Sequence, residues 1–344
     1  MYNQNTTILV TGGTGFLGAH CILQLLQQGY KVKTTIRTSS KKDKVLNMLK
    51  NGGIEHFENL SFVEADLTQD KNWDAAVDNC DYVLHVASPI HLQLPKHEDE
   101  MILPAVEGTL RVLQAAQKAN VKRVVMTSNF GAVGYSSKNP NEIITEKNWT
   151  DPKEKGLSAY NKSKVMAEKA AWEFMKNKGG AMELSVVNPV GIFGPALDKD
   201  LSSGFDLLKK IIDGSMKAIP NLVLGIVDVR DAADLHIKAM TNPKAAGERF
   251  LALSDGTFSL PQIANLLREK MPEISGKISK KGVPNWQVKL AALFNDHAKA
   301  IAPMLGVNRN ASNDKAKTFL GWKPRTKEEA ILETVKSMIH FQNI

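Results

Sequence analysis

A glycine-rich segment near the N-terminus limits the possible folds of this chain more than any other feature. Residues 11–18 read TGGTGFLG, follow a short apolar run at residues 8–10, and open a stretch whose apolar side chains recur with helical spacing. Glycines 12, 15 and 18 are three apart, a close relative of the GxGxxG spacing. Such a turn brings backbone amides and a helix N-terminus close to phosphate groups. We therefore predict a dinucleotide site that includes Gly12, Thr14, Gly15, Phe16 and Leu17.

Beyond this turn, short apolar runs alternate with longer amphipathic stretches along most of the chain. Their spacing predicts strands at residues 8–10, 32–36, 60–64, 82–86, 123–127 and 184–187, and helices at 15–28, 105–119 and 163–176. Parallel neighbouring strands need a crossover connection, which is usually a helix. This order therefore predicts an α/β fold built on a Rossmann-type, doubly wound parallel sheet.

The later third of the chain is less regular and indicates a smaller substrate-binding lobe. We expect the dinucleotide-binding domain over residues 1–190, with a return at about 222–254. The smaller C-terminal lobe then takes residues 191–221 and 255–344. Within it, the sequence SLP at 259–261 predicts the start of a helix through residue 270, because proline is well tolerated in the first helical turn.

Composition narrows the possible partners and the compartment. The net charge is +8, but neither zinc-finger spacing nor an RNA-recognition aromatic motif accompanies it, so we expect no nucleic-acid partner. No apolar run reaches membrane-spanning length, and we expect no membrane association and a monomer or homodimer. The two cysteines, Cys21 and Cys80, lack CxxC spacing and a metal partner. They favour a reducing compartment, so we predict a cytoplasmic protein without a metal site.

The end of the second predicted strand indicates which dinucleotide binds. Arg37 follows this strand at the place where NAD-preferring sites offer an acidic residue to the ribose, whereas an arginine accommodates the 2′-phosphate of NADP. A forked guanidinium suits a phosphate dianion, so Arg37 and the nearby Lys44 favour NADP(H). Asp66 and Leu67, just past another strand, form a candidate adenine contact. The alternative interpretation of Asp66 is a simple turn residue.

Tyr160 and Lys164 are candidate catalytic residues. They are four positions apart in the sequence YNKSK, which places both on one face of a helix. A tyrosine with a pKa near 10 is a poor acid–base group at neutral pH. A lysine ammonium beside it, together with the cationic nicotinamide of an oxidised cofactor, would lower that pKa. Tyr160 could then give its proton to a carbonyl oxygen as hydride arrives.

The resemblance of the chain to a known family extends over almost its whole length. The matching segments are TGGTGFLG at 11–18, IR at 36–37, HVASP at 85–89, PAVEGTLRVLQAA at 104–116, VKRVVMTS at 121–128, YNKSK at 160–164, NPVGIFGP at 188–195, DVRD at 228–231 and GWKPR at 321–325. With these segments the chain resembles the extended short-chain dehydrogenases/reductases. Within them it is similar to the dihydroflavonol reductase branch, which includes methylglyoxal and isovaleraldehyde reductases.

The resemblance implies further roles in cofactor binding. Residues at the end of the fourth strand would line the cofactor, two residues after the sixth strand would flank the nicotinamide, and Lys164 would hold the nicotinamide ribose. The residues implied in this way, together with Thr127 at the end of the fifth strand, are Val86, Ala87, Ser88, Pro189 and Val190.

One position departs from the family pattern. The third catalytic residue of the family is a serine, usually the second serine of a TSS triplet, but the triplet here is Thr127-Ser128-Asn129. Aligned on the glycine and valine that follow, Asn129 occupies the catalytic serine position. Its amide can donate to a carbonyl oxygen, as amides do in oxyanion holes. Alternatively, Ser128 takes the role, or the chemistry is weakened and the protein only binds cofactor.

A substrate pocket is expected beyond the carboxyl ends of the strands, between the two lobes. The candidate lining residues are Ile90, Gln93, Phe130, Tyr135, Phe193 and Phe205. This largely apolar wall favours a small aliphatic or aromatic carbonyl, and the predicted function is NADPH-dependent reduction of an aldehyde or ketone to an alcohol. The alternatives are an NAD-dependent nucleotide-sugar epimerase or dehydratase and a non-catalytic NADP-binding regulator.

Overall fold

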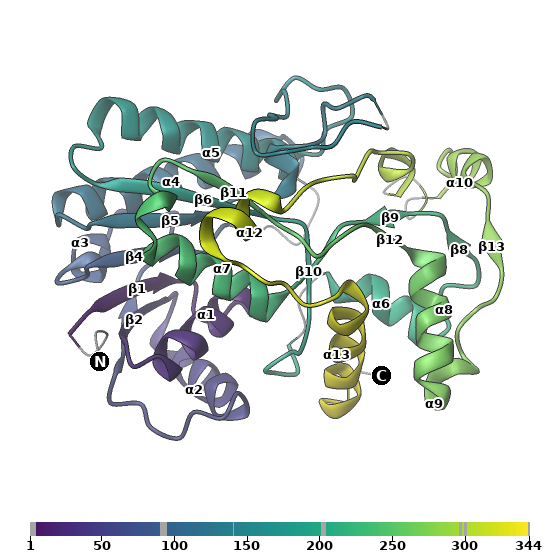
Figure 1. Cartoon of the computed structure of the whole chain (residues 1–344), viewed down its shortest axis with the longest axis horizontal. Coiled ribbons are helices and arrows are strands. Elements are labelled where there is room, and N and C mark those ends of the chain that lie inside the picture. Colours follow the sequence, from purple (N-terminus) through teal and green to yellow (C-terminus); the bar gives the residue numbers. More distant parts are fainter. Residues whose placement is uncertain are drawn as a thin grey trace.

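A parallel sheet of seven strands forms the centre of the protein in a computed structural model (Figure 1). The structure describes residues 5–89, 95–139, 141–200, 204–295, 298 and 301–342, without the side chain of 303. Every neighbouring pair in this sheet is parallel. From edge to edge the order is β11 (Arg249–Ala252), β6 (Glu183–Pro189), β5 (Arg123–Thr127), β4 (Tyr82–His85), β1 (Thr7–Thr11), β2 (Lys31–Ile36) and β3 (Leu60–Glu64).

Helices cover both faces of the sheet, and each face has its own apolar cluster. Strand residues buried on both faces explain why the strands appear as continuous apolar runs in the sequence. One face is packed by α1 (Phe16–Gln27), α2 (Lys42–Asn51), α7 (Val229–Thr241) and α12 (Asp314–Leu320). The other is packed by α3 (Trp73–Val77), α4 (Asp99–Lys118) and α5 (Ala159–Lys178). The predicted Rossmann-type doubly wound sheet is confirmed.

The strand order places a ligand site. The chain winds from β1 outward to β3 in one direction and then from β4 to β11 in the other, so the order reverses between β1 and β4. In open α/β sheets, ligands bind beyond the carboxyl ends of the strands at such a reversal. The glycine-rich turn lies at this point, because it connects β1 to α1.

Helix starts differ from the predicted ones for local reasons. The apolar spacing placed the start of one helix at residue 105, directly after Pro104. In the structure, α4 begins at Asp99 and continues through Pro104. Similarly, α5 begins before the predicted residue 163, because the Ser158 side chain accepts from the Asn161 amide at 3.2 Å and caps the helix. This earlier start brings Tyr160 into the first turn of α5.

A further apolar cluster, the lobe cluster, lies outside the sheet and contains residues between Phe193 and Ile226 and between Phe258 and Met338. Within it, α8 (Leu260–Lys270) begins at the predicted SLP sequence, and Ser259 and Gln262 form a capping box at its start. Figure 1 shows most of these elements together on the side of the sheet away from α2 and α3. They are β7 (Gly191–Phe193), α6 (Phe205–Ile212), β8 (Ile219–Pro220), β9 (Val223–Leu224), β10 (Ile226–Asp228), β12 (Phe258–Ser259), α8 (Leu260–Lys270), α9 (Pro272–Ser275), β13 (Gly282–Val283), α10 (Asn285–Ala291) and α13 (Lys327–His340).

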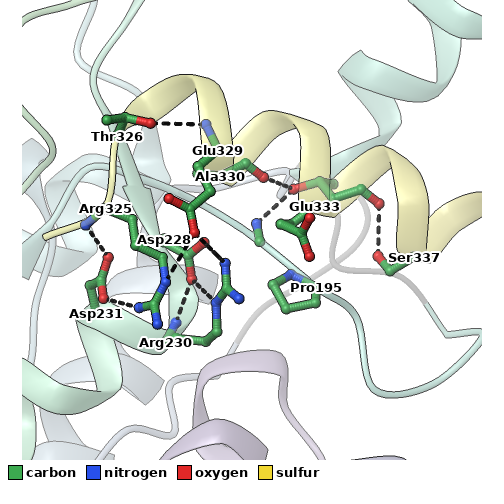
Figure 2. A network of polar contacts seen from close by, with 12 residues as sticks. Pro195, Asp228, Arg230, Asp231, Arg325, Thr326, Glu329, Ala330, Glu333 and Ser337 are labelled. Atoms are coloured by element: carbon green, nitrogen blue, oxygen red, sulfur yellow. Dashed lines mark hydrogen bonds and ion pairs between the residues drawn. The ribbon is translucent and has the colours of Figure 1, made fainter. Parts of the chain in front are cut away.

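The two late segments that carry the family resemblance, DVRD and GWKPR, contact each other at the start of α13 (Figure 2). The Arg325 guanidinium pairs with the Asp231 carboxylate, which also accepts from the Arg325 amide at 2.6 Å. Arg230 pairs with Asp228 at 2.7 Å, and the Trp322 indole donates to the Asp231 carbonyl at 2.9 Å. These motifs therefore join the last helix to α7, and their role here is structural.

The first turn of α1 requires a glycine at position 18. A Cβ there would lie 2.3 Å from the Gly12 carbonyl oxygen, closer than real contacts allow. Gly18→Ala should therefore push α1 away from the turn and destabilise the fold by about 1–3 kcal/mol, as overpacking does. Thermal unfolding monitored by circular dichroism measures the effect. Gly276→Ala is the control, because a Cβ there meets nothing within 4 Å. Equal unfolding temperatures of the two variants would contradict the tight-contact argument.

Candidate active site

A cleft of about 1680 Å³ opens at the carboxyl ends of the central strands. Pockets for single small molecules have volumes of roughly 300–1,000 Å³, so this cleft has room for a dinucleotide and a second small ligand. It brings together most of the residues predicted from the sequence. These are Gly12, Thr14, Gly15, Phe16, Leu17, Arg37, Asp66, Leu67, Val86, Ala87, Ser88, Thr127, Ser128, Asn129, Phe130, Tyr135, Tyr160, Lys164, Pro189, Val190 and Phe193.

The glycine-rich turn forms a backbone cradle at one end of the cleft. Gly12 has a φ of +78°, a left-handed conformation that favours glycine, and its carbonyl accepts from the Gly15 amide at 2.9 Å. The Thr35 side chain holds the Gly12 amide at 3.0 Å. Gly15 precedes α1 without a side-chain cap, so the first amides of the helix face the cleft without a capping group. A negatively charged phosphate is stabilised at such a helix end.

Beside this cradle, Arg37 is exposed at the edge of the cleft, and no ion pair within 4 Å joins it to another described residue. Asp66 lies close enough for the Arg37 charge to contribute to the lowered pKa of its carboxyl, although hydrogen bonds from Thr68 lower it more. Asp66 accepts from the Thr68 amide at 2.9 Å, the geometry of a turn-capping aspartate. Lys41, which the sequence analysis did not single out, also lines this edge.

Lys44 does not line the cleft, in contrast to the prediction that groups it with Arg37. Its ammonium pairs with Asp200 at 2.5 Å and lies 3.6 Å from Asp198. These carboxylates follow β7, more than 150 positions along the chain. Arg37 and Lys44 are only seven positions apart in the sequence, but their side chains have different surroundings.

Segments after β4 and β6 complete the wall where a nicotinamide would lie. The Thr11 hydroxyl contacts the His85 ring at 3.0 Å and accepts from the Ala87 amide at 3.0 Å. Burial lowers the pKa of His85 to about 3, so the ring is neutral at physiological pH and acts as a hydrogen-bonding spacer between β1 and β4. Pro189 is the last residue of β6, Val190 follows it, and both line the cleft.

Tyr160 and Lys164 lie one turn apart on α5 and both line the cleft. The Lys164 Nζ atom is 5.9 Å from the centroid of the Tyr160 ring. Burial lowers the pKa of Lys164 to about 8, while Glu168 opposes this shift. Because a pKa of about 8 is still above neutral pH, Lys164 is mostly charged at pH 7.

The pKa of Tyr160 is raised in the protein without cofactor, whereas the predicted lowering depends on Lys164 together with an oxidised nicotinamide. Burial of the hydroxyl is the largest cause, and the nearby Tyr135 adds to it. The Asn129 side chain acts in the opposite direction through a hydrogen bond to the Tyr160 hydroxyl. Tyr160 is consequently protonated at neutral pH, as a proton donor must be. The lowering predicted for the complex with an oxidised cofactor stays a prediction.

Both candidates for the third catalytic position face the cleft. Ser128 Oγ and Asn129 Oδ1 are buried, and neither has a hydrogen-bond partner among the described residues. The neighbouring Thr127 hydroxyl, in contrast, contacts the His236 ring at 2.7 Å. Buried polar atoms normally have partners, so unpaired ones in a cleft are typical of a site that a ligand completes. Of the two, Asn129 is the one whose side chain acts on the pKa of Tyr160.

A buried ion pair supports the catalytic helix from behind. Glu168, one turn beyond Lys164, is fully buried and accepts from Arg249 of β11 at 2.6 Å. Asn188 of β6 donates to Glu168 at 2.8 Å and to the Asn129 carbonyl at 3.3 Å. Through this chain of hydrogen bonds, α5 and the segment after β5 are held in register, which keeps Tyr160 beside Asn129.

Of the residues predicted to line the substrate pocket, one described residue does not line the cleft. Phe130, Tyr135 and Phe193 line the cleft. Phe205 does not, because α6 turns its apolar face inward and buries Phe205 completely. Its ring packs against the Phe16 ring, with 5.1 Å between the two ring centroids. The predicted lining residues Ile90 and Gln93 lie outside the described residues.

Residues from the last third of the chain also line this end and were missed. Arg309, Met304 and Val307 reach the cleft because the segment around Ala311 pairs with Ile144 in an isolated bridge. The bridge joins positions 167 residues apart, and no local sequence pattern predicts such a pairing.

Across the described ranges, no group of His, Cys, Asp and Glu side chains is arranged to hold a metal ion. Within the same ranges, no helix combines the length and the apolar character that a membrane crossing needs.

The fold and the cleft together define a dinucleotide-binding α/β protein of the short-chain dehydrogenase/reductase class. Its features are the glycine-rich turn at the strand-order reversal and the Tyr160–Lys164 pair facing the same cleft. The chain belongs to the NAD dependent epimerase/dehydratase family, whose family model matches residues 8–252.

Relatives within this family are similar over nearly the whole chain. Cinnamoyl-CoA reductase 1 of Arabidopsis thaliana is 35% identical over 91% of this chain and 89% of its own length. The crystal structure of Gre2 from Candida albicans in complex with NADPH superposes with a TM-score of 0.79 at 30% identity, over 98% of this chain and 99% of that one. Yeast methylglyoxal/isovaleraldehyde reductase Gre2 complexed with NADPH gives a TM-score of 0.81 at 27% identity, over 98% and 99%.

Proposed function

We propose that the protein reduces an aldehyde or ketone to an alcohol with NADPH. The observation that carries this proposal is the meeting of Tyr160, Lys164 and Asn129 in one cleft with the glycine-rich turn. The solved relatives that bind NADPH support the same cofactor and reaction. The test is direct: the purified protein should consume NADPH, followed by its absorbance, when simple aldehydes are added.

The residues of the cleft fit the dinucleotide. Its pyrophosphate would lie on the Gly12–Gly15 turn at the uncapped start of α1, where a Cβ at Gly12 would meet Ala87 at 3.0 Å. Arg37 would hold the 2′-phosphate, Asp66 and Leu67 the adenine, and Lys164 the nicotinamide ribose. When bound, the cofactor supplies a hydride to the carbonyl carbon. The remaining proposed contacts come from Phe16, Leu17, Thr14, Val86, Ala87, Ser88, Thr127, Pro189 and Val190.

Three side chains serve the reacting carbonyl in this proposal. The Tyr160 hydroxyl gives its proton to the carbonyl oxygen, which becomes the alcohol oxygen. Lys164 places a positive charge beside the tyrosinate that remains and stabilises it. The Asn129 amide donates to the oxygen while negative charge develops there. Phe130, Tyr135 and Phe193 form the apolar wall that receives the rest of a small substrate.

Arg37 should give NADPH a large advantage over NADH. A hydrogen bond to a charged group contributes about 1.5–3 kcal/mol, which corresponds to roughly a tenfold to 100-fold preference. Arg37→Ala should lower kcat/KM with NADPH by that factor and leave kcat/KM with NADH nearly unchanged. Steady-state rates with both cofactors and one aldehyde provide the measurement.

Lys44→Ala is the matched control for this prediction. Lys44 is paired with Asp200, so the structure argues for a small effect, whereas the sequence pattern groups it with Arg37. An effect as large as that of Arg37→Ala would show that Lys44 leaves its carboxylates for the phosphate. Equal use of NADH and NADPH by the parent protein would overturn the cofactor proposal itself.

Two further parts of the proposal follow the sequence. We place the enzyme in the cytoplasm, on the basis of its unpaired cysteines, Cys21 and Cys80, both buried and free. We also divide it into a cofactor domain and a smaller substrate lobe, with the two apolar clusters as support. One segment assigned to the lobe, Ala316–Trp322, packs on the apolar cluster of the sheet face that α1, α2 and α7 cover, and not on the lobe cluster outside the sheet.

A further inference from the structure

Arg309 is a buried cation at the substrate end of the cleft. Only 9% of its surface is exposed, and it lines the cleft. One of its terminal nitrogens donates to the Tyr135 hydroxyl at 2.9 Å. No ion pair within 4 Å joins it to a carboxylate of the described residues. Glu154 also lines the cleft, but its carboxylate is paired with Lys138 at 2.6 Å and so does not neutralise Arg309.

The backbone around Arg309 is held in place by hydrogen bonds on both sides. The Ile144 amide donates to the Asn310 carbonyl at 2.9 Å, and the Ser312 amide donates to the Ile144 carbonyl at 2.9 Å. The Asn308 side chain donates to the Asn139 carbonyl at 3.0 Å. Arg309 is therefore presented to the cleft from a fixed bridge and not from the end of a free loop.

Aromatic rings face the guanidinium, and no carboxylate of the described residues lies within 4 Å of it. Its central carbon is 4.5 Å from the centroid of the Tyr135 ring and 5.6 Å from that of Phe130. Aromatic faces stabilise a cation only in part, and a guanidinium has five N–H donors. Because buried charges are normally paired, a cation with one neutral hydrogen-bond partner has unused capacity for an anion.

Tyr135 connects this cation to the reacting end of the cleft. Its hydroxyl contacts Arg309, and its phenol lies close enough to Tyr160 to influence the titration of that side chain. Tyr160, Tyr135 and Arg309 all line the same cleft. A substrate whose carbonyl lies at Tyr160 therefore has Arg309 in the same cleft as a partner for a second group.

We propose that Arg309 binds an anionic oxygen group, a carboxylate or a phosphate, on the carbonyl substrate. The substrate class is thus narrowed to aldehydes and ketones that carry such a group a few bonds from the carbonyl. The planar guanidinium fork matches both groups through paired hydrogen bonds. This inference rests on the proposed reductase activity, since it names the substrate class of the same site.

Matched pairs of acid and neutral substrate test the inference. The probes are 4-carboxybenzaldehyde against methyl 4-formylbenzoate, 4-oxobutanoate against its methyl ester, and glyceraldehyde 3-phosphate against glyceraldehyde. The parent enzyme should show a kcat/KM about tenfold to 100-fold higher for the anionic member of at least one pair. The pair with the larger ratio tells whether a carboxylate or a phosphate is preferred.

Arg309→Gln should reduce that ratio to about one and keep the rate on the neutral member, while Arg309→Lys should retain part of the preference. Arg268→Gln removes the same charge from α8, where Arg268 donates to the Ser279 carbonyl at 2.8 Å and does not line the cleft, so it should keep the parent ratio. NADPH affinity and unfolding temperature show whether each variant is folded.

Two outcomes would overturn the inference: no preference for anionic members in the parent enzyme, or the same preference in Arg309→Gln. Failure of the reductase proposal looks different, because then neither member of any pair would be reduced by the parent enzyme. If Arg309→Gln loses its activity on both the anionic and the neutral substrate, together with its NADPH affinity, it has lost its fold. The ratio of kcat/KM values in Arg309→Lys then decides whether the inference holds.

Discussion

Tyr160→Phe should lower kcat for carbonyl reduction by about 100-fold or more, because it removes the general acid and keeps the ring. The hydroxyl is the group whose pKa burial raises and Asn129 lowers, so it is the protonated donor at neutral pH. Lys164 should remain in place, since its contact with this residue is to the ring face at 5.9 Å. Single-turnover rates with NADPH and one aldehyde measure the loss.

Cofactor binding is the control for this prediction. The tyrosine hydroxyl serves the substrate oxygen, so the dissociation constant for NADPH should change little in Tyr160→Phe. Lys164→Met should differ, because Lys164 is proposed both to stabilise the tyrosinate and to hold the ribose, and both kcat and NADPH affinity should fall. Near-parent turnover in Tyr160→Phe would mean that YNKSK is only the first turns of a helix and that the proton comes from elsewhere.

Much of the fold could be predicted because its signals are local. The strand at 60–64 and the strand at 123–127 match β3 and β5 at both ends, since buried parallel strands are short apolar runs bounded by turns. The glycine-rich turn located the cleft for the same reason. The predicted helix starts were less accurate for two helices. Ser158 caps α5 before its predicted start, and α4 begins before Pro104 and continues through it.

The parts of the site that the sequence did not reveal depend on distant contacts. Phe205 is apolar and near the expected pocket in sequence, yet α6 packs it against Phe16. Lys44 pairs with Asp198 and Asp200, which follow β7. Arg309 reaches the substrate end only through its bridge to Ile144. In each case the partner is more than 150 positions away, so no window of sequence contains both.

The titration of Tyr160 in the protein without cofactor also depends on the folded environment. A lysine four positions away and an oxidised nicotinamide predict a lowered pKa, but the amount of water around each group acts on its pKa as well. Here desolvation dominates for both, raising the pKa of Tyr160 and lowering that of Lys164 to about 8. The residue pair was predictable from spacing, whereas its electrostatics required the folded environment.

Asn129→Ala should lower kcat by about 100- to 1,000-fold, the typical loss when one donor to a developing oxyanion is removed. Asn129 faces the cleft and contacts the Tyr160 hydroxyl, and Asn188 anchors its carbonyl at 3.3 Å. The backbone anchor does not depend on the side chain, so the variant should keep the geometry of the turn. NADPH affinity should change little.

Asn129→Ser and Ser128→Ala separate this interpretation from its alternatives. Asn129→Ser should retain or raise activity, because it restores the hydroxyl that the family uses. Ser128→Ala should be mild, since of the two side chains only that of Asn129 acts on the pKa of the Tyr160 hydroxyl. If Ser128 is the donor, the order reverses: Ser128→Ala is severely impaired and Asn129→Ala is mild. Single-turnover rates of the three variants with one aldehyde decide, and if the parent protein itself reduces no carbonyl, a protein that only binds NADPH is the remaining interpretation.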